Sequence, residues 1–132
     1  MNRATRVRKR AEFTRIQGSG GRVSTRTFVL VVSGRPDQRP ARLGVTASRK
    51  IGGAVTRNRA KRIVREAFRA LGELFPSGID LVVIVRKPPG GMKTADVVAE
   101  WRGASKELAR RIEGALRACE RPDKLHDGPK GP

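Results

Sequence analysis

Basic side chains crowd one segment of this 132-residue chain, between Arg49 and Arg69. Its basic residues are Arg49, Lys50, Arg57, Arg59, Lys61, Arg62, Arg65 and Arg69, and its one acidic residue is Glu66. Arginine grips phosphate oxygens through paired hydrogen bonds and can stack on a base. Asn58 can donate to and accept from a base edge or a 2′-hydroxyl. The segment therefore predicts contact with nucleic acid, the alternative being a charged face that is merely solvated.

Helical spacing sorts this segment into two faces. Thr56 can cap a helix that runs from Arg57 to about Phe75. At about 3.6 residues per turn, one side is apolar and holds Ala60, Ile63, Val64, Ala67, Phe68, Leu71 and Phe75. The opposite side, the cationic ridge, holds Asn58, Arg62, Arg65 and Arg69, with Arg59 and Lys61 at its edges. The ridge begins at a helix N-terminus, which also attracts phosphate, and Glu66 is expected to pair with Arg62 or Arg69.

The whole chain shares this positive charge. Lysine and arginine total 30 and aspartate and glutamate total 12, which gives a net charge of +18. Such an excess opposes compaction and indicates a polyanionic partner, above all nucleic acid. A membrane surface is the alternative, but no apolar run is long enough to enter a bilayer. We expect no DNA partner, because nothing resembles a helix-turn-helix pair.

Side chains for independent catalysis are missing from the sequence. The chain has one histidine, His126, and one cysteine, Cys119, which cannot furnish a common zinc site. Its carboxylates are scattered, and no nucleophile–base pair stands out. We expect no catalytic residue and no metal or cofactor bound by the protein alone, with a protein-only nuclease as an alternative. A single cysteine, expected in the core, and the lack of an apolar signal region predict a cytoplasmic protein.

The elements that must position the ridge follow the order α-β-β-α-β-α. A helix is expected over 11–17, strands over 25–33, 42–48 and 79–85, and a last helix over 95–119 that Gly103 can bend. Residues 18–21 form a turn and 35–40 a hairpin-like loop. The strands on either side of the middle helix can lie parallel through a crossover. One domain is expected over 1–119, with a basic arm at 1–10 and a disordered tail at 120–132.

The stretch from Ser48 to Arg69 closely resembles the bacterial ribonuclease P protein family. The family has a basic strand end and an Ala-Val pair, then Arg-Asn-Arg, Lys-Arg and Arg-Glu-x-Phe-Arg on a helix. These stand at Ala54-Val55, Arg57-Asn58-Arg59, Lys61-Arg62 and Arg65-Glu66-Ala67-Phe68-Arg69, and a looser likeness runs from about Arg6 to Cys119. The resemblance implies an α+β, two-layer α/β sandwich with a small mixed sheet and a left-handed β-α-β crossover, like the second domain of a small-subunit ribosomal protein.

The resemblance also implies a function. Such a protein joins a catalytic RNA, which holds the magnesium ions, and the complex removes 5′ leaders from precursor tRNA. The catalytic RNA would contact Arg57, Asn58, Arg59, Lys61, Arg62, Arg65 and Arg69. The single-stranded leader would lie between the first helix and the sheet, at Phe13, Gln17, Val29, Val31, Arg49, Lys50, Arg57, Asn58 and Lys87. Many relatives carry aromatics at the positions of Gln17 and Val31, and Phe28 is expected to point into the core.

One alternative stays open beside the resemblance. A structural RNA-binding protein, similar to a ribosomal protein and without a role in cleavage, would have the same composition. Only the motif between Arg57 and Arg69 separates the two.

Overall fold

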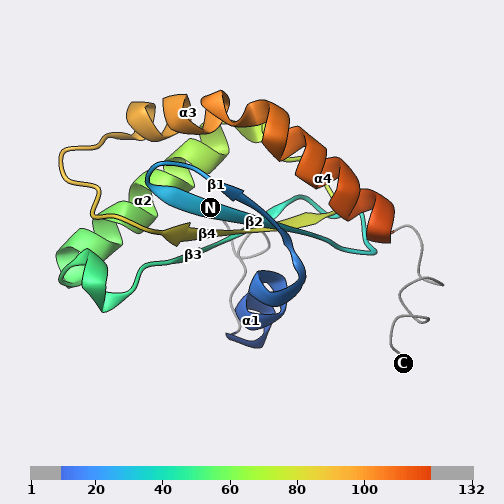
Figure 1. Cartoon of the computed structure of the whole chain (residues 1–132), viewed down its shortest axis with the longest axis horizontal. Coiled ribbons are helices and arrows are strands. Elements are labelled where there is room, and N and C mark those ends of the chain that lie inside the picture. The colour runs from blue at the N-terminus through green and yellow to red at the C-terminus, as the bar shows by residue number, and fades with distance from the viewer. Residues whose placement is uncertain (1–9, 120–132) are drawn as a thin grey trace.

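A computed structural model describes residues 10–119, with the backbone alone at residues 13, 14 and 17–19 (Figure 1). Its elements are α1 (Arg10–Ser19), β1 (Gly21–Ser24), β2 (Phe28–Gly34), β3 (Arg42–Thr46), η2 (Arg49–Ile51), α2 (Ala54–Ala70), η3 (Gly72–Leu74), β4 (Ile79–Val85), α3 (Thr94–Gly103) and α4 (Ser105–Cys119). The predicted basic arm, apart from Arg10, and the predicted tail lie outside the described residues.

The four strands form one mixed sheet in the order β1-β2-β4-β3. The β1–β2 and β2–β4 pairs are antiparallel, whereas β3 and β4 are parallel. The helix α2 connects the two parallel strands, as the sequence predicts for a crossover. The α+β class and the mixed sheet are therefore confirmed, while the left hand of the crossover stays a prediction.

Helices cover both faces of this sheet, with α2, α3 and α4 on one side and α1 on the other (Figure 1). The main core lies on the three-helix side, and all seven apolar residues predicted for the inner side of the middle helix are buried there. Trp101 of α3 packs edge-on between Phe28 and Phe75, with ring centroids 6.0 Å apart in each pair. Phe28 thus points into the core, as predicted.

No helix within residues 10–119 is long and apolar enough to cross a bilayer.

The first part of the sheet differs from the sequence prediction. The expected turn at 18–21 is instead the end of α1 and the start of β1. The expected strand over 25–33 is found as β2 from Phe28 onward, while residues 25–27 form the turn of a hairpin between β1 and β2. Glu100 of α3 holds this turn, because its carboxylate accepts hydrogen bonds from the backbone N of Thr27 (2.9 Å) and from the Thr25 hydroxyl. The loop at 35–40 is not a hairpin, since β4 lies between β2 and β3. Local sequence carries no sign of these long-range contacts.

The helix boundaries also differ from those predicted. The helix α2 begins at Ala54 with Gly53 as its N-cap, rather than at Arg57 with Thr56 as the cap, and it gives way to the short turn η3 before Phe75. The last helix is broken into α3 and α4 directly after Gly103, where a bend was expected. Cys119, at the end of α4, is half-buried rather than a core residue.

A buried ion network ties α1 to the sheet. Asp80 of β4 is fully buried, and its carboxylate accepts hydrogen bonds from Arg35 (2.7 Å) and Arg42 (2.8 and 2.9 Å). From α1, Arg15 lies 3.4 Å from the same carboxylate, and Glu12 pairs with Arg42 at 2.9 Å. Burial by itself raises the pKa of Asp80, but the hydrogen bonds from Arg42 and Arg35 outweigh it and leave the pKa below its ordinary value.

Candidate nucleic-acid interface

The N-terminus of α2 follows a sharp turn in the chain. Gly52 has a φ of +147°, a backbone conformation that residues other than glycine rarely adopt. The side chain of Thr56 lies over Gly52, where an added Cβ would be 3.0 Å from the Thr56 Cβ. The N-cap, Gly53, has no side chain that could cap the helix. The first backbone N–H groups of α2 therefore donate no hydrogen bond to an N-cap side chain, and a helix N-terminus of this kind attracts anions.

The outer face of α2 carries the predicted ridge. Asn58, Arg62 and Arg69 are exposed, and Arg65 is half-buried. Among residues 10–119, no ion pair joins Arg62 or Arg69 to an acidic side chain. Lys61, at one edge of the ridge, is half-buried. Arg62 and Arg69 therefore offer positive charge that no acid within residues 10–119 neutralises.

Glu66 does not pair with Arg62 or Arg69, so that prediction was wrong. Its carboxylate instead accepts a hydrogen bond from the hydroxyl of Thr94, the first residue of α3. The contact spans 28 residues of sequence, and the spacing rules for pairs on one helix could not reveal it. Because Glu66 bonds to α3, it does not neutralise the arginines of the ridge.

Two of the residues predicted to contact RNA, Arg57 and Arg59, also lie against other parts of the protein. Arg59 donates hydrogen bonds to the backbone oxygens of Gly90 (2.9 Å) and Met92, and so fastens the loop between β4 and α3 onto α2. Arg57 is half-buried, and its Nε is buried without a partner among the described residues. Contact of either side chain with RNA stays a prediction.

The α1 face of the sheet is built from three rows of neighbouring residues. The strand register gives the rows as Ser33–Asp80–Arg42, Val31–Val82–Gly44 and Val29–Ile84–Thr46. The first row carries the ion network. In the second, Val31 and Val82 are fully buried with Ile16 of α1. The third row, named the open row below, is only partly buried.

This arrangement separates the predicted leader-binding residues of the sheet. Val31 is fully buried beneath α1 and cannot reach a ligand while α1 lies there, whereas Val29 is accessible. Sequence reasoning missed Ile84 and Thr46, which lie beside Val29. The alternation of side chains along each strand places all three on one face, but only the register brings them into one row. The side chains of Phe13 and Gln17, both on α1, lie outside the described residues.

The remaining predicted residues gather at one end of the sheet. Because β3 and β4 are parallel, Arg49 and Lys50 after β3 emerge at the same edge as Lys87 after β4. All three side chains are exposed. The open row ends at this edge, since Thr46 and Ile84 are near the ends of their strands, and α2 begins there too. The fold thus places a group of basic side chains, called the basic edge below, at the end of the sheet beside the partly exposed open row.

Comparison with known proteins identifies the family. A family model described as Ribonuclease P matches residues 1–109. The ribonuclease P protein component of Gluconacetobacter diazotrophicus is 42% identical over 102 residues, which cover 76% of this chain and 88% of that protein. The component from Geobacillus kaustophilus is 39% identical over 97 residues, covering 74% and 80%.

Solved structures agree with the sequence comparison. The RNase P protein of Staphylococcus aureus matches with a TM-score of 0.70 at 32% identity, covering 83% of this chain and 99% of that one. The RNase P protein of Thermotoga maritima matches with a TM-score of 0.67 at 32% identity, covering 80% and 96%. With this family's motif on α2 and its fold around the sheet, the chain belongs to the bacterial ribonuclease P protein family, the protein subunit of a tRNA-processing endonuclease.

Proposed function

We propose that this chain joins a catalytic RNA and that the complex removes the 5′ leader of precursor tRNA. The observation that carries the proposal is the outer face of α2, where Arg62 and Arg69 are exposed without an acidic partner among the described residues. Arginines in such a row can each neutralise a phosphate of a folded RNA. The family role in tRNA processing supports the same partner.

We assign the leader to the α1 face of the sheet. The open row offers Val29, Ile84 and Thr46 as a surface on which unpaired bases can lie. The side chains of the basic edge, Arg49 and Lys50 after β3 and Lys87 after β4, can bind the phosphates of the leader. Phe13 of α1 would add an aromatic platform for a base. Val31 packs against Ile16 in the buried cluster between α1 and the sheet, so it does not contact the leader.

We place the reactive groups in the RNA. Among the described residues, no three or more His, Cys, Asp or Glu side chains are grouped so that they could hold a metal ion. Magnesium held by the RNA would activate water for attack on the phosphodiester bond. The protein contributes charge: at +18 it reduces the repulsion between catalytic RNA and substrate. We also propose a cytoplasmic location, which a single cysteine without a disulfide partner supports.

Reconstitution tests this division of labour. Precursor tRNA is incubated at low magnesium with the protein, with a bacterial ribonuclease P RNA, or with both. Mature 5′ ends should accumulate fastest with both. Cleavage by the protein without RNA, surviving nuclease controls, would show that the reactive groups lie in the chain. Tight RNA binding that leaves cleavage unchanged would instead support a purely structural RNA-binding role.

A further inference from the structure

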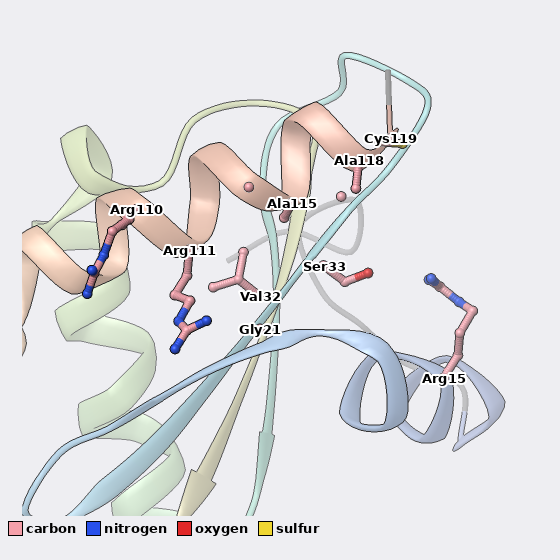
Figure 2. A pocket seen from close by; sticks show the side chains of 11 residues that line it. Arg15, Gly21, Val32, Ser33, Arg110, Arg111, Ala115, Ala118 and Cys119 are labelled. Carbon is pink, nitrogen blue, oxygen red and sulfur yellow. The ribbon is translucent and has the colours of Figure 1, made fainter. Parts of the chain in front are cut away.

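A hollow lies between α4 and the strands β1 and β2 (Figure 2). Its volume is about 580 Å³, within the range of pockets that hold small organic groups. It includes Gly34, which pairs with Ile79 at the start of β4, whereas the chain that leads to α2 leaves the sheet after Thr46, beside Ile84 near the other end of β4. At about 3.3 Å per residue, the two ends of β4 lie roughly 20 Å apart. The hollow thus lies at the opposite end of the sheet from Arg49, Lys50 and Lys87.

The hollow has an apolar floor and a cationic rim. Val32 of β2 and Ala115 of α4 contribute to the floor, while Arg15, Arg110 and Arg111 are its charged lining residues. No acidic side chain lines it among the residues that the structure describes. Figure 2 shows Arg111 hanging from α4 toward β1 and Arg15 extending from α1 on the opposite side. Arg15 is already paired with Asp80, so the charge available to a ligand in the hollow comes from Arg110 and Arg111 of α4.

The two arginines of α4 are not balanced by a described acid. In residues 10–119, neither Arg110 nor Arg111 forms an ion pair, although Arg117 on the same helix pairs with Glu113 at 3.1 Å. The stem of Arg111 lies over Gly21, where an added Cβ would be 3.3 Å from the Arg111 Cδ. Adjacent cations repel each other, and a bound phosphate relieves that repulsion.

We infer that this hollow takes one unpaired ribonucleotide of an RNA partner. Its phosphate would bind Arg110 and Arg111, and its base would lie against Ala115 and Ala118, which line the hollow and are not fully buried. Arginine suits both tasks, because its planar fork pairs with phosphate oxygens and stacks on a base. The inference rests on the proposed function, which supplies the RNA. The protein would then hold its RNA partner at two places, one along α2 and one beside α4.

The hollow contains its own reporter, since Cys119 lines it and is the single cysteine of the chain. The rate at which N-ethylmaleimide alkylates Cys119 is measured in the full-length protein, alone and with saturating RNA. Bound RNA should slow the reaction. The RNAs are a catalytic ribonuclease P RNA, precursor tRNA and the same tRNA without its leader. Protection by the catalytic RNA assigns the nucleotide to that RNA, whereas protection only by the leader-bearing precursor assigns it to the leader.

Charge-removing variants make the test specific. Arg110→Gln with Arg111→Gln keeps much of each stem and should abolish the protection. The slope of log binding constant against log salt should fall by about 0.7 for each lost contact to a single strand, or about 1.4 in all. The control, Arg102→Gln with Arg117→Gln, removes the same charge at two exposed ion pairs outside the hollow and should retain the protection.

Two outcomes would overturn the inference while leaving the proposed function intact. In a complex that assembles and cleaves normally, Cys119 could react as fast as in the isolated protein. Alternatively, RNA could protect Cys119 equally in the Arg110→Gln, Arg111→Gln protein. A protein that binds none of the RNAs would contradict the proposed function, and with it this inference.

Discussion

Arg35 and Asp80 form a buried ion pair, with the guanidinium Nη1 2.7 Å from the carboxylate Oδ1. Arg35 is 8% exposed and Asp80 is fully buried. The arginine also donates hydrogen bonds to the backbone oxygens of Ile79, Arg39 and Pro40. One side chain therefore joins the start of β4 to the loop between β2 and β3, and the same carboxylate anchors α1 through Arg15. The open row depends on where this network holds α1.

Replacing Asp80 by asparagine should destabilise the fold severely. Removing one member of a buried pair leaves the other charge uncompensated, at a cost of about 3–5 kcal/mol. Asp37→Asn is the matched control, because Asp37 also binds Arg35 but has a 45% exposed side chain. Urea unfolding should show a large loss of free energy for Asp80→Asn and a small one for Asp37→Asn. Equal losses would mean that burial does not set the strength of these pairs.

Acid should weaken the protein through the same carboxylate. The pKa of Asp80 is held below its ordinary value, because hydrogen bonds from Arg42 and Arg35 outweigh the opposing effect of burial. A depressed pKa contributes stability above the unfolded value, about 3.9, and loses it as the pH falls through the folded value. The free energy of unfolding should therefore drop below about pH 4. In Asp80→Asn this acid drop should be smaller, and an unchanged acid profile would contradict the assignment.

A close approach of α4 to β2 requires glycine at position 34. A Cβ on Gly34 would be 2.5 Å from the carbonyl oxygen of Ala115, a backbone atom that can move only with the helix. Gly34→Ala should thus cost about 1–3 kcal/mol by overpacking. Gly114→Ala is the contrasting change on α4, where a Cβ meets nothing within 4 Å, and it should raise stability by about 0.5–1 kcal/mol. Thermal melting that ranks the two variants the other way would refute this account.

The sequence predicted those parts of the fold that local patterns determine. The strand Ile79–Val85 was predicted with its observed boundaries, because an apolar run between a Gly and a Pro turn is unambiguous. The inner side of α2 followed from helical spacing. By contrast, the turn after β1 is held by Glu100 of α3, and the hydrogen-bond partner of Glu66 also lies on α3. Contacts between residues so far apart in the sequence cannot be predicted from local sequence patterns.

The candidate site divides in the same way. Exposure of Asn58, Arg62 and Arg69 followed from the helix pattern alone. Which strand residues form the accessible surface depended on the register and on the position of α1. Val31 and Val29 have the same chemistry and lie on the same face, yet Ile16 buries only the former fully. Alternation along one strand could not distinguish them.

Arg59 should behave differently from its neighbours on α2. Its hydrogen bonds to the backbone oxygens of Gly90 and Met92 hold the loop that follows β4. Arg59→Ala should lower stability, on the order of 1 kcal/mol for a charged donor at a partly exposed site, whereas Arg62→Ala should leave melting unchanged. If Arg59→Ala weakens RNA binding without lowering the melting temperature, its main role is RNA contact rather than loop anchoring.

The ridge itself is tested by changing Arg62 and Arg69 together to alanine. Both are exposed and alanine favours helix, so the fold should persist. If each arginine neutralises one phosphate of duplex RNA, taken to resemble DNA in charge density, the log–log salt slope should fall by roughly 0.9 per contact, or about 1.8. Changing Arg102 and Arg117 to alanine removes the same charge elsewhere and should alter the slope less. Asn58→Ala removes no charge, so affinity should drop while the slope stays constant. A double variant of the ridge that folds correctly and keeps the full slope would exclude this helix face from the RNA interface.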